Sequence, residues 1–164
     1  VDVLAMIAPK DNKEVTIEPD LAAPEAIIKG VHEELQQAIT NLTQNAVDAV
    51  GKGGHVWVRT RAEARAVRIE VVDDGPGIPK EVLARIFTPF FTTKEVGKGM
   101  GLGLTITRQV IKQHGGTLDV DSTPGTGTTF TIRLPLASEA LDAQDRTSVL
   151  EQAGATDEPP PVTP

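Results

Sequence analysis

The longest regular pattern in the chain has the period of an α-helix and spans His32 to Val50. Apolar residues recur there at intervals of three and four, which places them on one face of a helix. These residues are Leu35, Ile39, Leu42, Ala46 and Ala49. Glycines at 51, 53 and 54 then favour a turn that ends the helix. We therefore expect a long helix that packs its apolar face against the rest of the protein.

Alternation of apolar and polar residues predicts two hairpins. Residues 55–62 and 66–73 alternate on either side of a short polar turn, which is typical of paired strands. Residues 116–122 and 128–136 repeat this arrangement around a glycine turn at 124–127. Short strands are also expected at 1–8 and 13–18, and residues 26–30 are a candidate for another.

Two further helices complete the expected secondary structure. Residues 79–86 are expected to form a short helix with proline in its first turn. Residues 102–114 are expected to form a longer one, with Gly115 and Gly116 as its C-terminal cap. Residues 87–100 lack a regular period. Because the strands follow one another mostly through hairpins, we expect a mixed, mostly antiparallel sheet with helices packed on one face, a two-layer α/β sandwich.

Composition and charge narrow the class of protein. The formal net charge is −7, and residues 137–164 hold six acidic residues and one basic residue. We therefore expect one domain over 1–136, followed by an acidic, proline-rich tail or linker over 137–164. The nearly neutral body has no basic stripe, which argues against nucleic acid as a partner. No cysteine and no apolar run near membrane-spanning length are present, so neither a disulfide framework nor direct membrane contact is expected.

The sequence GKGMGLGL at 97–104 places four glycines in eight positions just before the second long helix. The amides of such a loop and the positive end of the helix dipole suit an anion such as phosphate. The loop lacks the glycine and hydroxyl positions of a P-loop, and Leu104 stands where a dinucleotide fingerprint needs its third glycine. A flexible hinge without a ligand is the alternative for this stretch alone.

A polar stripe on the first long helix is a candidate metal site. Asn41, Asn45 and Asp48 recur at intervals of four and three, beside the apolar stripe. An amide oxygen can bind Mg²⁺, which prefers oxygen ligands together with nucleotide phosphates and waters. The alternative is a polar flank that only meets solvent.

Two loops add candidate nucleotide contacts. VVDDGPGIP at 71–79 ends an apolar strand with Asp73, whose carboxylate would accept a hydrogen bond from the amine of adenine. Gly75 and Gly77 would let a flat base approach the backbone, although an ordinary acidic turn is the alternative. IFTPFFTTK at 86–94 holds three of the four phenylalanines. These are expected to be buried anchors of a lid whose Lys94 reaches toward phosphate.

These blocks, together with the glycine turn TPGTGTTF at 123–130, resemble in this order the N, G1, F, G2 and G3 boxes of sensor histidine kinases. The resemblance covers about residues 26–136 and is to the catalytic, ATP-binding domain, which has the Bergerat fold of the GHKL group. That group also contains gyrase, heat-shock chaperone and mismatch-repair ATPases. The PFFTTK form is most similar to nitrogen-regulatory kinases.

The resemblance implies roles for individual residues. Asn45 would coordinate Mg²⁺, Asn41 would support the phosphates and the metal, and Lys94 would join them in catalysis. Asp73 would hold the adenine amine, and Gly75 and Gly77 would shape its pocket. The position of Asp48 is often basic in the family, so no phosphate contact is expected from this acidic residue. The remaining implied nucleotide contacts are Ile78, Lys98, Gly99, Met100, Gly101, Leu102, Gly103 and Thr128.

One position separates a kinase from an ATPase. Gyrase-like members carry a glutamate one helical turn before the metal-binding asparagine, and this glutamate activates water. Asn41 stands there in this chain, and an amide cannot act as a general base near neutral pH. The resemblance therefore favours transfer of the γ-phosphoryl group to histidine. The alternative is an ATPase or serine protein kinase of the same fold.

None of the three histidines suits the role of phosphoacceptor. His32 lacks the arginine and proline of the family's acceptor motif, His55 falls in a turn, and His114 suits the dipole of a helix C-terminus as a partly charged imidazole. The implied partners are therefore a separate dimerisation and phosphoacceptor domain and the receiver domain of a response regulator. With no initiator methionine and no signal-peptide pattern, the chain is expected to be a cytoplasmic fragment of a larger kinase, which could carry a membrane anchor elsewhere.

Overall fold

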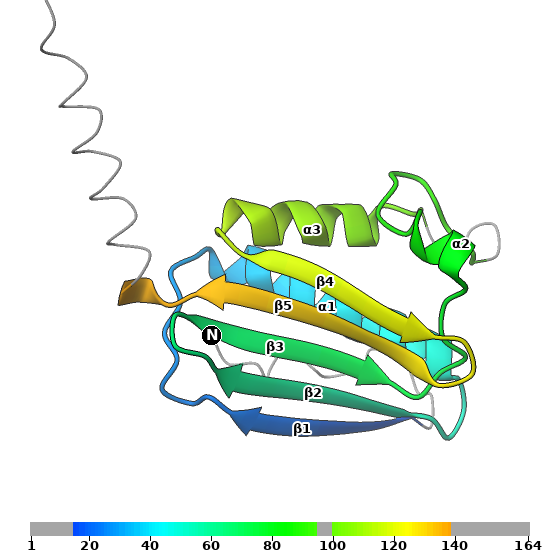
Figure 1. Cartoon of the computed structure of the whole chain (residues 1–164), viewed down its shortest axis with the longest axis horizontal. Helices are drawn as coiled ribbons and strands as arrows, with labels where there is room; N and C mark the ends of the chain where they lie inside the picture. Colours follow the sequence, from blue (N-terminus) through cyan, green and yellow to red (C-terminus); the bar gives the residue numbers. More distant parts are fainter. Residues whose placement is uncertain (1–14, 95–99, 139–164) are drawn as a thin grey trace, which may run out of the picture.

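Five strands form one mixed sheet, and the helices pack against one of its faces (Figure 1). The computed structural model describes residues 15–94 and 100–138. The strands are β1 (Thr16–Ala22), β2 (His55–Ala62), β3 (Ala66–Asp73), β4 (Thr117–Thr123) and β5 (Gly127–Pro135). Their order in the sheet is β1-β2-β3-β5-β4. Only β1 and β2 are parallel, and the other neighbours are antiparallel, which confirms the expected α/β sandwich.

The helices are α1 (His32–Val50), α2 (Lys80–Leu83) and α3 (Gly103–Gln113). The bounds of α1 are those that its apolar stripe predicts. α2 ends earlier than expected, and residues 84–87 continue as turns. Pro89 lies shortly beyond and disfavours helical geometry in the residue before it. α3 is one residue shorter at each end than predicted.

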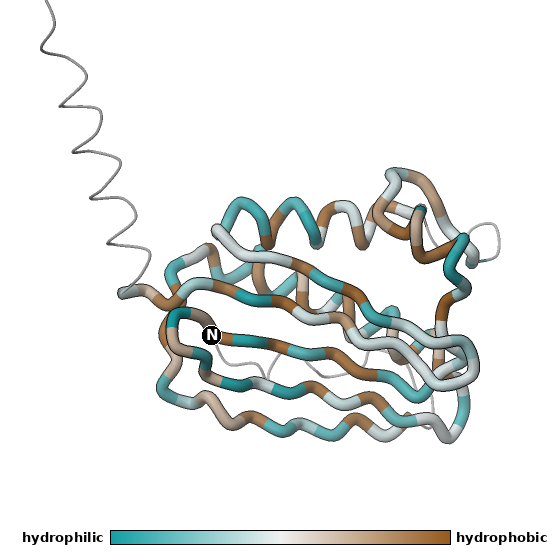
Figure 2. The backbone as a smooth tube through the Cα atoms, viewed as in Figure 1, coloured by the Kyte–Doolittle hydropathy of each residue, from teal (hydrophilic) through white to brown (hydrophobic). Residues whose placement is uncertain are grey.

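The core lies between α1 and the sheet. Leu35, Ile39 and Leu42 are at most 1% exposed, and the inward positions of β2, β3 and β5 meet them from the other side. Apolar and polar positions alternate along these strands (Figure 2). Ala49 is an exception to the predicted stripe, because it is exposed and Val47 is buried in its place.

The expectations for the N-terminal region need correction. β1 covers 16–22, and its bounds follow from parallel pairing with β2, from Thr16 beside His55 to Ala22 beside Arg61. As an edge strand it accommodates Pro19, which cannot donate a backbone hydrogen bond. The candidate strand at 26–30 is reduced to a single bridge between Ile28 and Leu136. The strand predicted at 1–8 and the tail from 139 onward lie outside the described residues.

His114 joins the ends of the two helices that carry most of the candidate site. Its Nε2 accepts a hydrogen bond of 3.0 Å from the amide of Val31, just before α1. Nδ1 must then carry the proton and donates to the carbonyl oxygen of Val110, 2.8 Å away. Both ring nitrogens are thus engaged within the fold, which gives His114 a structural role at this helix end. In the part of the chain that is described, no helix has the length and hydropathy needed to cross a membrane.

Candidate nucleotide-binding site

The predicted boxes meet at the end of the sheet where β3 ends and where β4 turns into β5, on the right in Figure 1. Asp73 is the last residue of β3 and pairs with Thr128 of β5. It is only 4% exposed, and its Oδ1 accepts a hydrogen bond of 2.9 Å from the amide of Gly75. The structure therefore provides a buried carboxylate at the C-terminal end of β3, held in place by the loop that follows it.

Burial raises the pKa of the Asp73 carboxyl above its ordinary value of 3.8, although backbone hydrogen bonds from Gly75 and Thr128 act in the opposite direction. Because this pKa is raised in the folded state, the folded protein binds the proton more tightly than the unfolded chain does. The ionised carboxylate therefore costs stability at neutral pH, and this cost disappears as the pH falls below 3.8.

We expect the NMR signal of the Asp73 carboxyl carbon to titrate with a midpoint above 3.8. Affinity for a non-hydrolysable ATP analogue is expected to decline over the same pH range, because the protonated acid is a weaker acceptor than the carboxylate. Circular dichroism over that range checks that the fold persists. A midpoint at or below 3.8 would contradict the assignment of a desolvated carboxyl.

The loop that follows Asp73 is fixed against the β4–β5 hairpin. The amide of Ile78 donates to Ser122 Oγ at 2.8 Å, and this hydroxyl donates to the carbonyl oxygen of Gly127 at 3.0 Å. The amide of Gly125 donates to the carbonyl oxygen of Pro76 at 2.8 Å. Sequence reasoning missed Ser122, because its role depends on how the hairpin and the loop meet. A hydroxyl just before the glycine turn was the only signal.

Gly77 is required by this contact. Its φ of +68° is one that side chains rarely adopt, and an added Cβ would overlap the backbone carbonyl of Thr123. We expect Gly77→Ala to lower the free energy of unfolding by about 2 kcal/mol or more, from both strain and overlap. Gly125→Ala is the matched control, since Gly125 has a φ of +82° but open space around it. Urea denaturation of both variants makes the comparison, and equal losses would contradict the close approach at Gly77.

Two residues of the polar stripe on α1 contact different parts of the fold. Asn41 Nδ2 donates to Thr107 Oγ1 of α3 at 2.9 Å, and Gly103 packs so closely that an added Cβ would meet the Asn41 amide. Asn45 Oδ1 instead accepts a hydrogen bond of 3.1 Å from Lys94 Nζ. Asn41 therefore positions the start of α3, whereas Asn45 faces the segment that carries Lys94.

The phenylalanine segment forms the base of the predicted lid, and it corrects one expectation. Phe87 and Phe91 are partly buried against the core, where Arg108 lies 4.8 Å over the first ring and Arg85 lies 4.4 Å over the second. Phe90 is not a buried anchor: it is 74% exposed and has a φ of +64°. Aromatic anchoring therefore comes from two of the three rings.

The glycine-rich loop reaches α3 beside this segment. Gly101 has a φ of +66° and its carbonyl oxygen accepts a hydrogen bond of 3.0 Å from the amide of Phe90. Leu102 and Gly103 follow directly at the start of α3, and Met100 is 79% exposed. The predicted contacts Lys98 and Gly99 lie outside the described residues.

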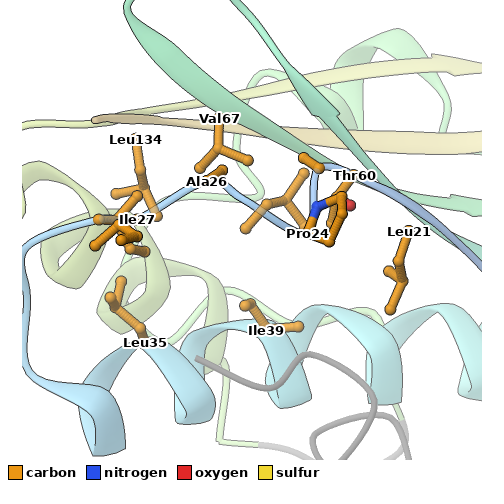
Figure 3. A pocket seen from close by; sticks show the side chains of 12 residues that line it. Leu21, Pro24, Ala26, Ile27, Leu35, Ile39, Thr60, Val67 and Leu134 are labelled. Atoms are coloured by element: carbon orange, nitrogen blue, oxygen red, sulfur yellow. The ribbon is translucent and has the colours of Figure 1, made fainter. Parts of the chain in front are cut away.

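An apolar cavity of about 410 Å³ lies at the other end of the molecule (Figure 3). It is bounded by the N-terminal half of α1, including Leu35 and Ile39, and by the segment from Leu21 to Ile28. None of the predicted site residues lines it. Its lining contains no charged side chain, so it does not suit a nucleotide phosphate.

The residues gathered at this end of the sheet fit both ATP and a magnesium ion. Asp73 is a buried acceptor, and the amide of Gly75 holds its carboxylate in place. Asn45 Oδ1 already attracts a cation, the ammonium group of Lys94. Within 15–94 and 100–138, no group of three or more His, Cys, Asp or Glu residues could hold a metal. Mg²⁺ does not need such a group, because phosphates and waters complete its shell.

A mixed sheet backed by helices, with a buried aspartate at the strand end and an asparagine on the facing helix, defines a nucleotide-binding catalytic domain of the α/β sandwich class. The chain belongs to the family of histidine kinase-, DNA gyrase B- and HSP90-like ATPases, whose sequence profile matches residues 30–138. Members of the histidine kinase branch are its relatives in sequence and in structure, and the chain is a histidine kinase ATPase catalytic domain.

The relatives include sensor kinases and histidine kinases. Sensor kinase CckA of Brucella abortus (strain 2308) is 40% identical over 159 residues, which cover 88% of this chain and 17% of CckA. The catalytic domain of histidine kinase ThkA has a TM-score of 0.67 at 31% identity, covering 75% of this chain and 81% of that one. ThkA in complex with response regulator protein TrrA has a TM-score of 0.64 at 28% identity, covering 76% of this chain and 35% of that one. The chain thus spans less than a fifth of the length of CckA.

Proposed function

We propose that this domain binds Mg²⁺-ATP and transfers the γ-phosphoryl group to a histidine on a separate dimerisation domain, as one step of two-component signalling in the cytoplasm. The observation that carries the proposal is the buried carboxylate of Asp73, held by Gly75 at the sheet edge where the nucleotide boxes meet. The structural relative ThkA, a histidine kinase, supports the choice of histidine as acceptor. Likeness to nitrogen-regulatory kinases in the PFFTTK stretch stays part of the proposal.

The work of the domain is positioning and charge neutralisation. Asp73 accepts the adenine amine, and Ile78 and Thr128 border the base. The backbone of Gly101, Leu102 and Gly103, at the start of α3, faces the phosphates. When bound, magnesium neutralises charge on the phosphates, and Asn45 is the residue that would hold it. Lys94 supplies a positive charge from the lid side of the site. Asn41 fixes α3 against α1 through Thr107.

The acceptor histidine is proposed to come from another domain. Both ring nitrogens of His114 are engaged within the fold. His55 lies 3.3 Å from Glu18 and stacks on Trp57 at 5.7 Å, on the sheet. His32 begins α1 itself. Phe90, an exposed aromatic beside the predicted lid, is a suitable contact for the domain that brings the histidine.

A response regulator is the proposed next partner. The solved complex of ThkA, a structural relative, with response regulator protein TrrA supports this choice. The absence of a general base at Asn41 separates the proposal from an ATPase or serine kinase of the same fold. Asn41 is an amide already bonded to Thr107, and Glu33 and Glu34 lie about three helical turns before Asn45 on α1.

The test supplies the chain with ATP and a separately purified dimerisation domain that contains the histidine. We expect nucleotide binding by calorimetry, slow ATP turnover by the chain alone, and phosphohistidine only when the second domain is present. Brisk turnover without that domain would favour the ATPase. Failure to bind ATP would remove the proposal altogether.

A further inference from the structure

We propose that Asp48 is a positioning residue, which holds Lys94 on Asn45 so that the ammonium group of Lys94 competes with the metal for the same amide oxygen. This inference rests on the proposed function, since it assigns the magnesium ion to Asn45. Lys94 Nζ lies 2.8 Å from Asp48 Oδ2 and 3.1 Å from Asn45 Oδ1. The stronger of these two contacts of Lys94 is the ion pair with Asp48.

The arrangement of α1 explains why both side chains reach one ammonium group. Asn45 and Asp48 are three residues apart on the helix, so their side chains lie on neighbouring turns of the same face. Asp48 is itself held, because its Oδ1 accepts a hydrogen bond of 3.0 Å from Gln44 Nε2. A carboxylate fixed in this way directs Lys94 to the adjacent oxygen of Asn45.

The acidic residue also changes where the positive charge of the site comes from. Asp48 cannot contact a phosphate, and it instead attracts the lysine at the end of the phenylalanine segment, 46 positions later in the chain. The positive charge of the site is therefore carried by Lys94, on the lid side, and not by a residue of α1. Lys94 and Asp48 are 36% and 30% exposed, so water and salt screen their attraction and the pair can open.

Two cations that share one oxygen repel each other. If Asn45 holds magnesium, its Oδ1 atom would no longer accept a hydrogen bond from the ammonium group, and Lys94 would be displaced. Once displaced, Lys94 is free to meet the γ-phosphate. A nucleotide without magnesium can bind while Lys94 stays on Asn45. Loading of the metal and release of the lysine are thus one exchange.

The experiment measures ADP affinity by calorimetry at graded Mg²⁺ concentrations, because ADP lacks the γ-phosphate that Lys94 would contact. We expect Lys94→Met to lower the Mg²⁺ concentration needed for half-maximal affinity roughly tenfold, since the competing charge is gone. In the Asp48→Asn background, Lys94 is no longer held on Asn45, and the same substitution should have little effect. This double-mutant cycle isolates the coupling between the two residues.

Lys112→Met, an exposed lysine in the last turn of α3, is the matched control and should leave the magnesium requirement unchanged. NMR of the side-chain amide of Asn45 gives a readout without nucleotide, and its signals should shift in Lys94→Met. An unchanged or higher magnesium requirement in Lys94→Met, or an equal effect in both backgrounds, would overturn the inference while leaving nucleotide binding intact. Absence of ADP binding by the unmodified chain would instead overturn the proposed function and this inference with it.

Discussion

Replacing Asp73 with asparagine is expected to abolish measurable ATP binding by this domain. The substitution exchanges an anionic acceptor for an amide whose NH₂ group would face the amine of adenine. A hydrogen bond to a charged group contributes up to about 3 kcal/mol, and leaving a buried partner unsatisfied adds to the loss. Calorimetric titration with a non-hydrolysable ATP analogue measures the effect, and we expect affinity to fall at least ~100-fold.

Asp121→Asn is the matched control for this prediction. It makes the same chemical change on β4, but Asp121 is exposed, so ATP affinity should stay near that of the unmodified chain. Thermal unfolding of both variants shows whether the fold survives. Tight ATP binding by a folded Asp73→Asn variant would refute the placement of adenine at the end of β3.

Replacing Asn45 with alanine is expected to remove magnesium-dependent phosphoryl transfer while leaving the nucleotide bound. The substitution deletes the amide oxygen proposed to hold the metal, so charge on the phosphates is no longer neutralised in the reacting geometry. Removing one such electrostatic contact costs about 100-fold or more in rate. Transfer of labelled phosphate to the separate dimerisation domain, followed over time at saturating ATP, measures the loss.

The control for Asn45→Ala is Gln37→Ala, which removes an exposed amide from the same helix. Transfer by this control should match the unmodified chain. ADP binding in the presence of a chelator should also be little changed in Asn45→Ala, because adenine recognition lies at Asp73. A variant that keeps magnesium-dependent transfer would show that the metal is held elsewhere.

Much of the fold follows from local patterns. α1 spans the residues that its apolar stripe predicts, because a helix that covers a sheet must bury one face along its whole length. The hairpin of β2 and β3 likewise follows from alternation that matches the pleat of a half-buried sheet. The sequence predicted an element less well where the bounds of that element depend on pairing with another element. The bounds of β1 follow from its parallel pairing with β2, which no local pattern records.

The candidate site shows the same division. Five short boxes in order were enough to indicate the family and its nucleotide, since each box has residue types suited to one part of ATP. The individual binding residues that these boxes imply stay predictions. The exposure of Phe90 was not predictable, because a phenylalanine in a loop is usually buried and only the backbone at φ +64° turns this one outward. Ser122 was missed for a related reason, because its contacts are made across the hairpin.

The sequence by itself determined the class of fold, the helix that carries Asn41 and Asn45, and the carboxylate at the end of β3. These features depend on the spacing of residues within single elements. Only the tertiary structure decided that Asn41 bonds to Thr107 of α3 and that Asp48 holds Lys94 beside Asn45. Such contacts join residues 46 to 66 positions apart, and their geometry exists only after the helices and the phenylalanine segment have packed together.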